Sequence, residues 1–226
     1  SLNEPFFCRK YSKPIMLAIA IAAFNQLSGI NAVLYYSPRI FEMAGFSEGL
    51  LTSTAVGFSM LVFTMLALIV IDHFGRRKLM IAGSIGYIIS LSAIAWAFYT
   101  YGADFKAFLE HGTPVSGIGS QVVLWGLIAF VAAHGFGQGA VIWVYISEVF
   151  PNRVRARGQA LGSFTHWFMA AAISWSFPMF AEINVGHIFV FYTVCMILQL
   201  LWAMFLMPET KNISLEEIED KLGISD

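Results

Sequence analysis

Three amide side chains surround a Ser-Gly pair in the middle of the first long apolar segment. Asn25 and Gln26 precede Ser28-Gly29, and Asn31 follows it. An amide buried in an apolar medium without a hydrogen-bond partner costs several kcal/mol. These groups therefore need partners on neighbouring helices, in water or in a bound ligand, which makes them the first candidates for a binding site.

The glycine of this pair is a point at which a helix can break. On an ideal helix Asn31 shares a face with Tyr35, one turn later, whereas Gln26 lies about 140° from Asn31. A break at Gly29 would bring the polar groups together. The other interpretation is that the amides join helices, at about 0.6 kcal/mol each, but three amides beside one glycine exceed what helix association usually needs.

The fourth apolar segment combines glycines with an indole ring. Gly135, Gly139 and Trp143 recur every four residues and would lie on one helix face, with His134 and Gln138 beside them. This thin face would either admit a ligand beneath the indole or form a small-residue packing seam. The apolar C–H faces of a sugar ring are one kind of surface that suits such stacking.

Histidines in the fourth and fifth segments are further candidates. His166 is followed by Trp167, and both His134 and His166 are as consistent with packing as with ligand contact. The two histidines lie on separate segments without an acidic residue at their depth, so we expect no metal site. Paired carboxylates and a nucleophile beside a base are also missing, so we expect neither an enzyme nor a cofactor.

The composition requires a surface that faces lipid. Hydrophobic residues make up 58% of the chain and charged residues 12%, against about 25% charged residues in a soluble domain. The apolar residues form continuous runs long enough for helices to cross a bilayer, and not the short alternating segments of a β-barrel. We expect an all-α membrane protein with six transmembrane helices in the runs Pro14–Tyr36, Leu50–Ile71, Leu79–Tyr101, Val122–Phe150, Ala160–Phe180 and Ile188–Met207.

The basic residues set the expected orientation. Eleven Lys and Arg residues fall on one side of this topology and two, Arg39 and Lys106, on the other. An excess of basic residues marks the cytoplasmic side of a membrane protein. We therefore expect a multi-pass protein of the cell membrane with both termini in the cytoplasm: residues 1–13 as a lead-in, 14–207 as the transmembrane domain and 208–226 as a tail.

Two segments outside the apolar runs carry local signals. In the tail, Ser214 and Glu217 fit a capping box and predict a short helix. The polar, glycine-containing stretch Gly102–Gly119 is expected to be an irregular outer loop.

The six runs fall into two groups of three whose first members share a feature. The first run is interrupted by Ser28-Gly29, and the fourth by the glycines of Gly135–Gly139. Interrupted apolar segments at corresponding positions of two repeats point to the binding site of a transporter.

Four motifs, in order along the chain, resemble those of the sugar porter family of the major facilitator superfamily. The segment from Asn25 to Asn31, followed by Tyr35, is similar to the Gln-Gln-Leu-Ser-Gly-Ile-Asn motif of that family's seventh helix. The other three matches are Asp72 to Arg77, which resembles the acidic-x-x-Gly-Arg-Arg loop, Ser147 to Gly158, which resembles the loop after the tenth helix, and Pro208 to Lys211, which resembles the tail motif.

The resemblance implies a fold and a function. Because the family has twelve helices, the chain would be the C-terminal half of a major facilitator fold, made of two inverted three-helix repeats. It would work with a missing N-terminal six-helix half as part of a symporter or uniporter that moves a monosaccharide by alternating access. The expected partners are the sugar, the other half and the lipid bilayer, and not nucleic acid.

The motifs also imply roles for individual residues. Gln26, Asn31 and Tyr35 fall on positions that hydrogen-bond the sugar in the family, and Trp143 matches the tryptophan beside it. Together with the candidates above, the expected substrate-binding residues are Asn25, Gln26, Asn31, Tyr35, His134, Trp143, His166 and Trp167. In the family, arginines of the Gly-Arg-Arg loop pair with the glutamate after the tenth helix and hold the cytoplasmic gate closed. The resemblance therefore implies a gate in which Arg76 or Arg77 pairs with Glu148.

Three other interpretations stay open at this point. The chain would be a membrane sensor that binds a sugar without transporting it, a membrane enzyme, or a six-helix half that works as a homodimer. The lack of catalytic carboxylates and nucleophiles argues against the enzyme. Counterflow in vesicles tests for the sensor, and cross-linking in mild detergent tests for the homodimer.

Overall fold

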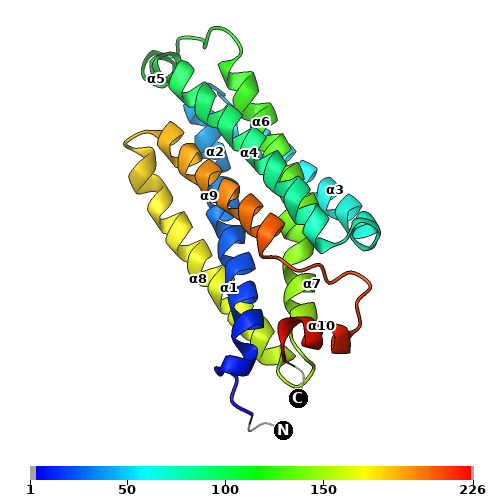
Figure 1. The fold of residues 1–226 in the computed structure, drawn as a ribbon. Helices are drawn as coiled ribbons and strands as arrows, with labels where there is room; N and C mark the ends of the chain where they lie inside the picture. Colours follow the sequence, from blue (N-terminus) through cyan, green and yellow to red (C-terminus); the bar gives the residue numbers. More distant parts are fainter. Residues whose placement is uncertain (1–3, 225–226) are drawn as a thin grey trace.

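The computed structural model describes residues 4–224, which are helical apart from turns and short connections and contain no strand. The helices start near one end of the bundle with α1, reach α5 at the opposite end, and return to α10 beside the end of α7 (Figure 1). Their bounds are η1 (Arg9–Tyr11), α1 (Ser12–Leu27), α2 (Ile30–Met43), α3 (Gly49–Phe74), α4 (Arg76–Thr100), α5 (Gly102–His111), α6 (Gly119–His134), the π-turn η2 (Gly135–Gly139), α7 (Ala140–Val149), α8 (Arg155–Ala181), α9 (Val185–Phe205) and α10 (Leu215–Leu222). The predicted all-α class is confirmed.

Hydropathy supports five of the six predicted membrane spans. The five helical segments that are long and apolar enough are Arg9–Met43, Gly49–Phe74, Arg76–Thr100, Gly119–Val149 and Val185–Phe205. The remaining predicted run lies in α8, whose 27 residues would extend about 40 Å. Thr165, His166 and two tryptophans lower the mean hydropathy of α8. Two of the candidate site residues, His166 and Trp167, therefore help to explain why hydropathy does not identify α8 as a span.

The break expected at Gly29 is confirmed. Gly29 separates α1 from α2 with φ +82°, in the left-handed region that favours glycine. The Ser28 hydroxyl donates to the Asn25 carbonyl at 2.6 Å and accepts from the Ile30 N–H at 3.3 Å, so it bonds backbone groups on both sides of the break. A Cβ at Gly29 would lie 2.2 Å from Cε2 of Tyr192, so packing also requires glycine here.

A second break separates α6 from α7. Within η2, Gly137 has φ −97° and ψ −105°, outside the helical region. A Cβ on Gly137 would lie 3.0 Å from Cα of Gly83 on α4, so paired glycines let the two helices approach closely. The interruption predicted for the fourth run is therefore confirmed as well.

Buried polar residues separate two apolar clusters in the interior. One cluster reaches α5 and the other reaches α10. Where four helical segments pass from one cluster to the other, each has buried polar side chains, and five of these are joined in one run of hydrogen bonds. We call these residues the polar layer: Asn25, Gln26, Ser84, Gln138 and Gln199.

The two short helices outside the apolar runs gave opposite outcomes. The capping box of α10 is confirmed, since Ser214 Oγ accepts from the Glu217 N–H at 3.2 Å and Glu217 Oε2 accepts from the Ser214 N–H at 3.2 Å. The prediction of an irregular loop over Gly102–Gly119 was wrong, because the first half of this stretch forms α5. Phe105 anchors α5 with its ring centroid 5.4 Å from that of Phe98 in the core.

Candidate functional site

Gln26 stands at the centre of the polar groups that the sequence singles out. Its side chain is fully buried on α1, just before the break. Gln26 Nε2 donates to Asn25 Oδ1 at 3.0 Å and lies 3.3 Å from Nε2 and 3.4 Å from Nδ1 of His166 on α8. The structure thus brings together three of the predicted site residues at the α1–α8 contact.

Aromatic rings flank this amide cluster. The Trp143 ring centroid on α7 lies 5.2 Å from that of His166, and the Trp167 ring meets His166 edge-on at 4.8 Å. Trp143 is 41% exposed and Trp167 is 58% exposed, although both belong to helices of an apolar bundle. The two indoles therefore offer open ring surface beside a buried polar group, an arrangement suited to a ligand with both apolar and hydroxyl-bearing faces.

Two buried polar atoms of the predicted site have no hydrogen-bond partner among the described residues. They are Gln26 Oε1, which can only accept, and Asn31 Nδ2, which can only donate. An unpaired buried polar group costs about 1–3 kcal/mol. A ligand that carries hydroxyl groups would satisfy both atoms, because a hydroxyl both donates and accepts.

Two other predicted residues make no direct contact with Gln26 within residues 4–224. Tyr35 on α2 is 61% exposed, and no hydrogen bond or ring contact within residues 4–224 joins it to the amide cluster. His134 is buried, and its Nδ1 shares a hydrogen bond with the Tyr87 hydroxyl, which favours the packing interpretation for this histidine. Within the same residues no group of three His, Cys, Asp or Glu side chains could hold a metal ion.

The sequence analysis did not predict two further amides, Gln138 and Gln199, that are hydrogen-bonded to this cluster through Asn25. Asn25 Nδ2 donates to Gln138 Oε1 at 3.3 Å, and Gln138 Nε2 donates to Gln199 Oε1 at 2.8 Å. The sequence placed Gln138 beside the glycines of the fourth run without giving it a role. Gln199 could have been found as the single amide in the otherwise apolar helix α9.

Charged residues gather at the turn between α3 and α4 and at the end of α7. Arg76 Nε donates to Glu148 Oε2 at 3.0 Å and Arg76 Nη2 to Glu148 Oε1 at 2.7 Å, while Nη1 reaches Asp72 at 3.2 Å. The Arg76 side chain is only 10% exposed, so this bidentate pair is largely shielded from water. Of the two arginines expected near Glu148, Arg77 instead donates to the Ala203 carbonyl of α9 at 3.0 Å.

Glu209, which follows α9, completes this charged cluster and was not predicted as a site residue. Its carboxylate accepts from the N–H groups of Arg76 at 3.0 Å and Arg77 at 3.1 Å, and from two N–H groups of its own turn at 3.0 Å each. A carboxylate is favourable at the N-terminus of a helix such as α4. The Thr210 hydroxyl donates to Glu148, so the tail and the α7 end share one network.

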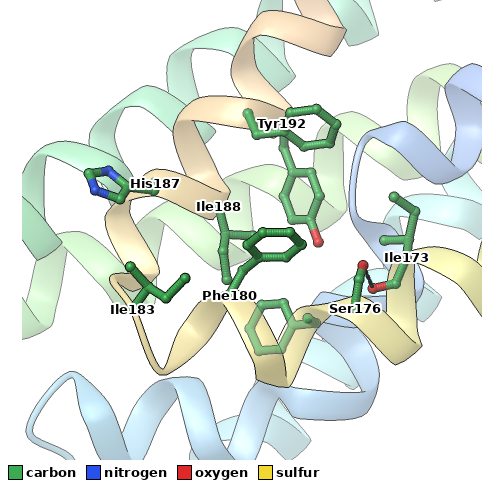
Figure 2. Close-up of a pocket in the computed structure, with 9 residues that line it drawn as sticks. Ile173, Ser176, Phe180, Ile183, His187, Ile188 and Tyr192 are labelled. Atoms are coloured by element: carbon green, nitrogen blue, oxygen red, sulfur yellow. Dashed lines mark hydrogen bonds between the residues drawn. The ribbon is translucent and has the colours of Figure 1, made fainter.

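An apolar pocket of about 310 Å³ lies between the end of α8 and the start of α9 (Figure 2). None of the predicted substrate-binding residues lines it. Its lining comprises Ile173, Ser176, Phe177, Phe180, Ile183, His187, Ile188, Phe191 and Tyr192. Tyr192 connects the pocket to the first break, because the same ring covers Gly29.

Comparison with known proteins assigns the chain to a family. Residues 1–222 match the family model described as Sugar (and other) transporter. The chain belongs to the sugar transporter family. It is 38% identical over 210 residues to the arabinose-proton symporter of Bacillus subtilis, covering 92% of this chain and 42% of that protein. It is 33% identical over 214 residues to the D-xylose-proton symporter of Escherichia coli, covering 91% and 40%.

Solved structures of the sugar transporter family have the same fold as this chain. It matches the proton:xylose symporter XylE bound to 6-bromo-6-deoxy-D-glucose with a TM-score of 0.77 at 33% identity, over 92% of this chain and 42% of that one. The inward-open xylose transporter XylE from E. coli gives a TM-score of 0.78 at 32% identity, over 98% and 44%. The fold is therefore that of the major facilitator superfamily.

Membership in the sugar transporter family agrees with the class of protein expected from the sequence. Proteins of this family are multi-pass membrane transporters and not enzymes, in agreement with the prediction from the sequence. The chain spans about two fifths of the length of the curated relatives that it matches.

Proposed function

We propose that this chain forms one wall of the central sugar site of a secondary transporter, opposite an N-terminal half of six helices. The observation that carries the proposal is Gln26, a fully buried amide whose Oε1 lacks a partner and whose Nε2 meets His166. The exposed indole of Trp143 beside His166 supplies a stacking surface. Transport then requires this wall to rock against the other half, which is how alternating access works in this class of fold.

The substrate is a monosaccharide. Gln26 and Asn31 offer one acceptor and one donor, and a sugar hydroxyl can satisfy either. Two of the relatives named above carry xylose or arabinose in their names. A carrier must release what it binds, so a millimolar site, at about −4 kcal/mol, is sufficient.

The membrane topology consists of six spans, with α8 as the fifth in chain order. α8 is long enough to cross, and the start of α1 and the α10 region lie toward the same end of the bundle (Figure 1), which an even number of crossings requires. With basic residues concentrated at that end, residues 1–13 and 208–226 are cytoplasmic and 14–207 are embedded in the cell membrane.

The charged cluster is the cytoplasmic gate of this transporter. Arg76 and Glu148 tie the start of α4 to the end of α7, and Glu209 holds the α4 N-terminus from the other side. A contact that forms in only one of two conformations shifts their equilibrium by its full differential energy. We assign this contact to the outward-facing state alone, so the bidentate pair favours that state.

The sugar-site proposal is tested with Gln26→Ala in the intact transporter. Loss of one polar contact should weaken binding of the preferred sugar among xylose, arabinose and glucose by about 5–30-fold, or about 1–2 kcal/mol. Gln121→Ala, which alters an exposed amide on α6, is the matched control and should leave binding unchanged. Unchanged binding in folded Gln26→Ala protein would remove Gln26 from the site.

Counterflow in vesicles separates transport from sensing. A transporter exchanges labelled sugar across the bilayer, whereas a sensor binds the sugar and exchanges none. Binding without counterflow in the unaltered protein would therefore replace the transporter with the sensor.

A further inference from the structure

The proposed sugar contact leaves the other members of the polar layer without a role. Gln138, Gln199 and Ser84 are each 0% exposed, and they come from η2, α9 and α4. They are joined to Asn25 by a continuous run of hydrogen bonds. Burying three polar side chains in an apolar bundle is costly unless every group is paired.

The first backbone anchor of this run is the Met80 carbonyl on α4. The Ser84 hydroxyl donates its single hydrogen to that carbonyl at 2.7 Å. With its hydrogen on the Met80 carbonyl, the Ser84 oxygen accepts from Gln199 Nε2 at 2.7 Å. Gln199 Oε1 then faces Gln138.

A second backbone anchor fixes Gln138 independently. Gln138 Nε2 donates to the Ile21 carbonyl at 3.3 Å and to Gln199 Oε1 at 2.8 Å, which uses both of its hydrogens. Gln138 Oε1 then accepts from Asn25 Nδ2 at 3.3 Å. Turning the Gln138 amide over would place its oxygen against the Ile21 carbonyl oxygen, so this anchor sets the direction, and the Ser84 bond agrees with it.

The direction of the run decides what Gln26 can offer a ligand. Asn25 Oδ1 must accept, and it does so from Gln26 Nε2 at 3.0 Å. The remaining hydrogen of Gln26 Nε2 points to the ring nitrogens of His166. Both hydrogens are thereby engaged, and Oε1 is left buried and unpaired.

We propose that Gln138 and Gln199 are positioning residues that hold Gln26 with its carbonyl oxygen toward the ligand. The site therefore selects a ligand group that donates a hydrogen bond at this point, a hydroxyl and not an ether oxygen or a fluorine. This inference rests on the proposed function, because it assumes that Gln26 touches the sugar. It assigns the selectivity to residues that do not touch the sugar themselves.

The test uses sugar analogues in which one hydroxyl is replaced by fluorine, which cannot donate. In the intact transporter, the preferred sugar among xylose, arabinose and glucose is compared with its fluoro analogues, one position at a time, by equilibrium binding. We expect the analogue at one position to bind about tenfold more weakly than the parent sugar, as the loss of a donor to a buried carbonyl requires. If every fluoro analogue binds the unaltered protein as well as the parent sugar does, the inference is overturned before any variant is made.

Variants then locate the origin of this discrimination. Gln138→Met keeps the side-chain length but removes the anchor, so Gln26 can turn over, and the fluoro-to-parent ratio at the sensitive position should fall several-fold. Ser84→Ala is a milder change at the far end of the run and should move the same ratio in the same direction. Ser90→Ala is the matched control, since Ser90 is also buried on α4, but among residues 4–224 its hydroxyl bonds only to carbonyls of its own helix, at 2.8 and 3.2 Å.

The outcomes separate this inference from the proposed function. If Gln26→Ala leaves binding of the parent sugar unchanged, the sugar site itself is wrong. If Gln26→Ala weakens binding while Gln138→Met and Ser84→Ala leave the fluoro-to-parent ratio as in the unaltered protein, the sugar site stands and the positioning role is overturned. A change in the ratio that Ser90→Ala produces equally would also overturn it.

Discussion

The guanidinium of Arg76 holds both oxygens of Glu148, through Nε at 3.0 Å and Nη2 at 2.7 Å, and so joins the start of α4 to the end of α7. The two residues are separated by 72 positions in the chain. The pair connects one broken segment, η2–α7, to the helix that packs against its break. Any rearrangement at Gly137 that moves α7 relative to α4 must stretch or release this contact.

Glu148→Gln should shift the intact transporter toward its inward-facing state. The substitution removes the negative charge that Arg76 pairs with, and a loss of about 1.4 kcal/mol changes a conformational ratio tenfold. The reporter is Tyr35→Cys, an exposed position on α2, in a background with Cys8→Ser and Cys195→Ser. Labelling of this cysteine from the cytoplasmic side should increase.

The control for this prediction is Glu110→Gln. Glu110 pairs with Lys106 at 3.8 Å on α5, where both side chains are exposed, and such pairs contribute about 0–1 kcal/mol. Glu110→Gln should therefore leave the labelling of the Tyr35→Cys reporter unchanged. Equal labelling in Glu148→Gln and the unaltered protein would mean that the basic residues of the α3–α4 turn serve topology alone.

Glu209→Ala should lower the thermal stability of the purified protein in detergent. The carboxylate accepts four backbone N–H groups, two of them at the start of α4. Hydrogen bonds to a charged group contribute about 1.5–3 kcal/mol each, so the melting temperature should fall by several degrees. Glu216→Ala, an exposed carboxylate in the first turn of α10, should change it little, and a similar fall in both variants would refute this role for Glu209.

Gly29→Ala should disrupt the break between α1 and α2. Alanine in the left-handed region costs about 1–2 kcal/mol, and its Cβ would overlap the Tyr192 ring, which adds about 1–3 kcal/mol of overpacking. Sugar binding should weaken together with thermal stability, because Asn25 and Asn31 are held on either side of this turn. Gly57→Ala is the control, since a Cβ at Gly57 on α3 meets nothing within 4 Å. Wild-type stability in Gly29→Ala would contradict the packing at this site.

Residues 1–226, purified and reconstituted alone, should not transport sugar. The proposed site would then have one wall, and exposed indoles such as Trp143 would face lipid or water instead of the other half. Uptake of labelled xylose or arabinose into vesicles is the measurement. Saturable uptake by this chain alone would favour a homodimer of six-helix halves.

The sequence predicted those parts of the molecule that depend on local rules. Apolar runs of helical length identified five of the spans, and glycines identified both breaks, because a left-handed φ or a close helix approach leaves few alternatives. The capping box of α10 followed from two residues three positions apart. α5 was missed because Phe105 is stabilised by a ring contact with Phe98 on another helix, which no local pattern encodes.

The candidate site likewise contains residues that the sequence predicted and contacts that it did not. Asn25, Gln26 and His166 were each predicted as site residues and lie together, but the contact between Gln26 and His166, 140 positions apart, was not predicted. Gln199 was overlooked although it is the single amide of α9, and its partners Gln138 and Ser84 could not be predicted because a lone amide does not show which residue it bonds to. Which of Arg76 and Arg77 pairs with Glu148 could likewise not be predicted from the sequence, because adjacent helical residues point in different directions.

The polar layer also bears on how these helices find their final register in a membrane. Lipid tails are as apolar as leucine, so apolar side chains alone give neighbouring helices little reason to prefer one sliding position over another. A slip of one turn would move Gln199 about 5.4 Å along α9, away from Ser84 and into an apolar cluster. A buried asparagine excludes shifted pairings in coiled coils by the same means. The amides at the middle of this bundle therefore align η2, α1, α4 and α9 during assembly, before any sugar is present.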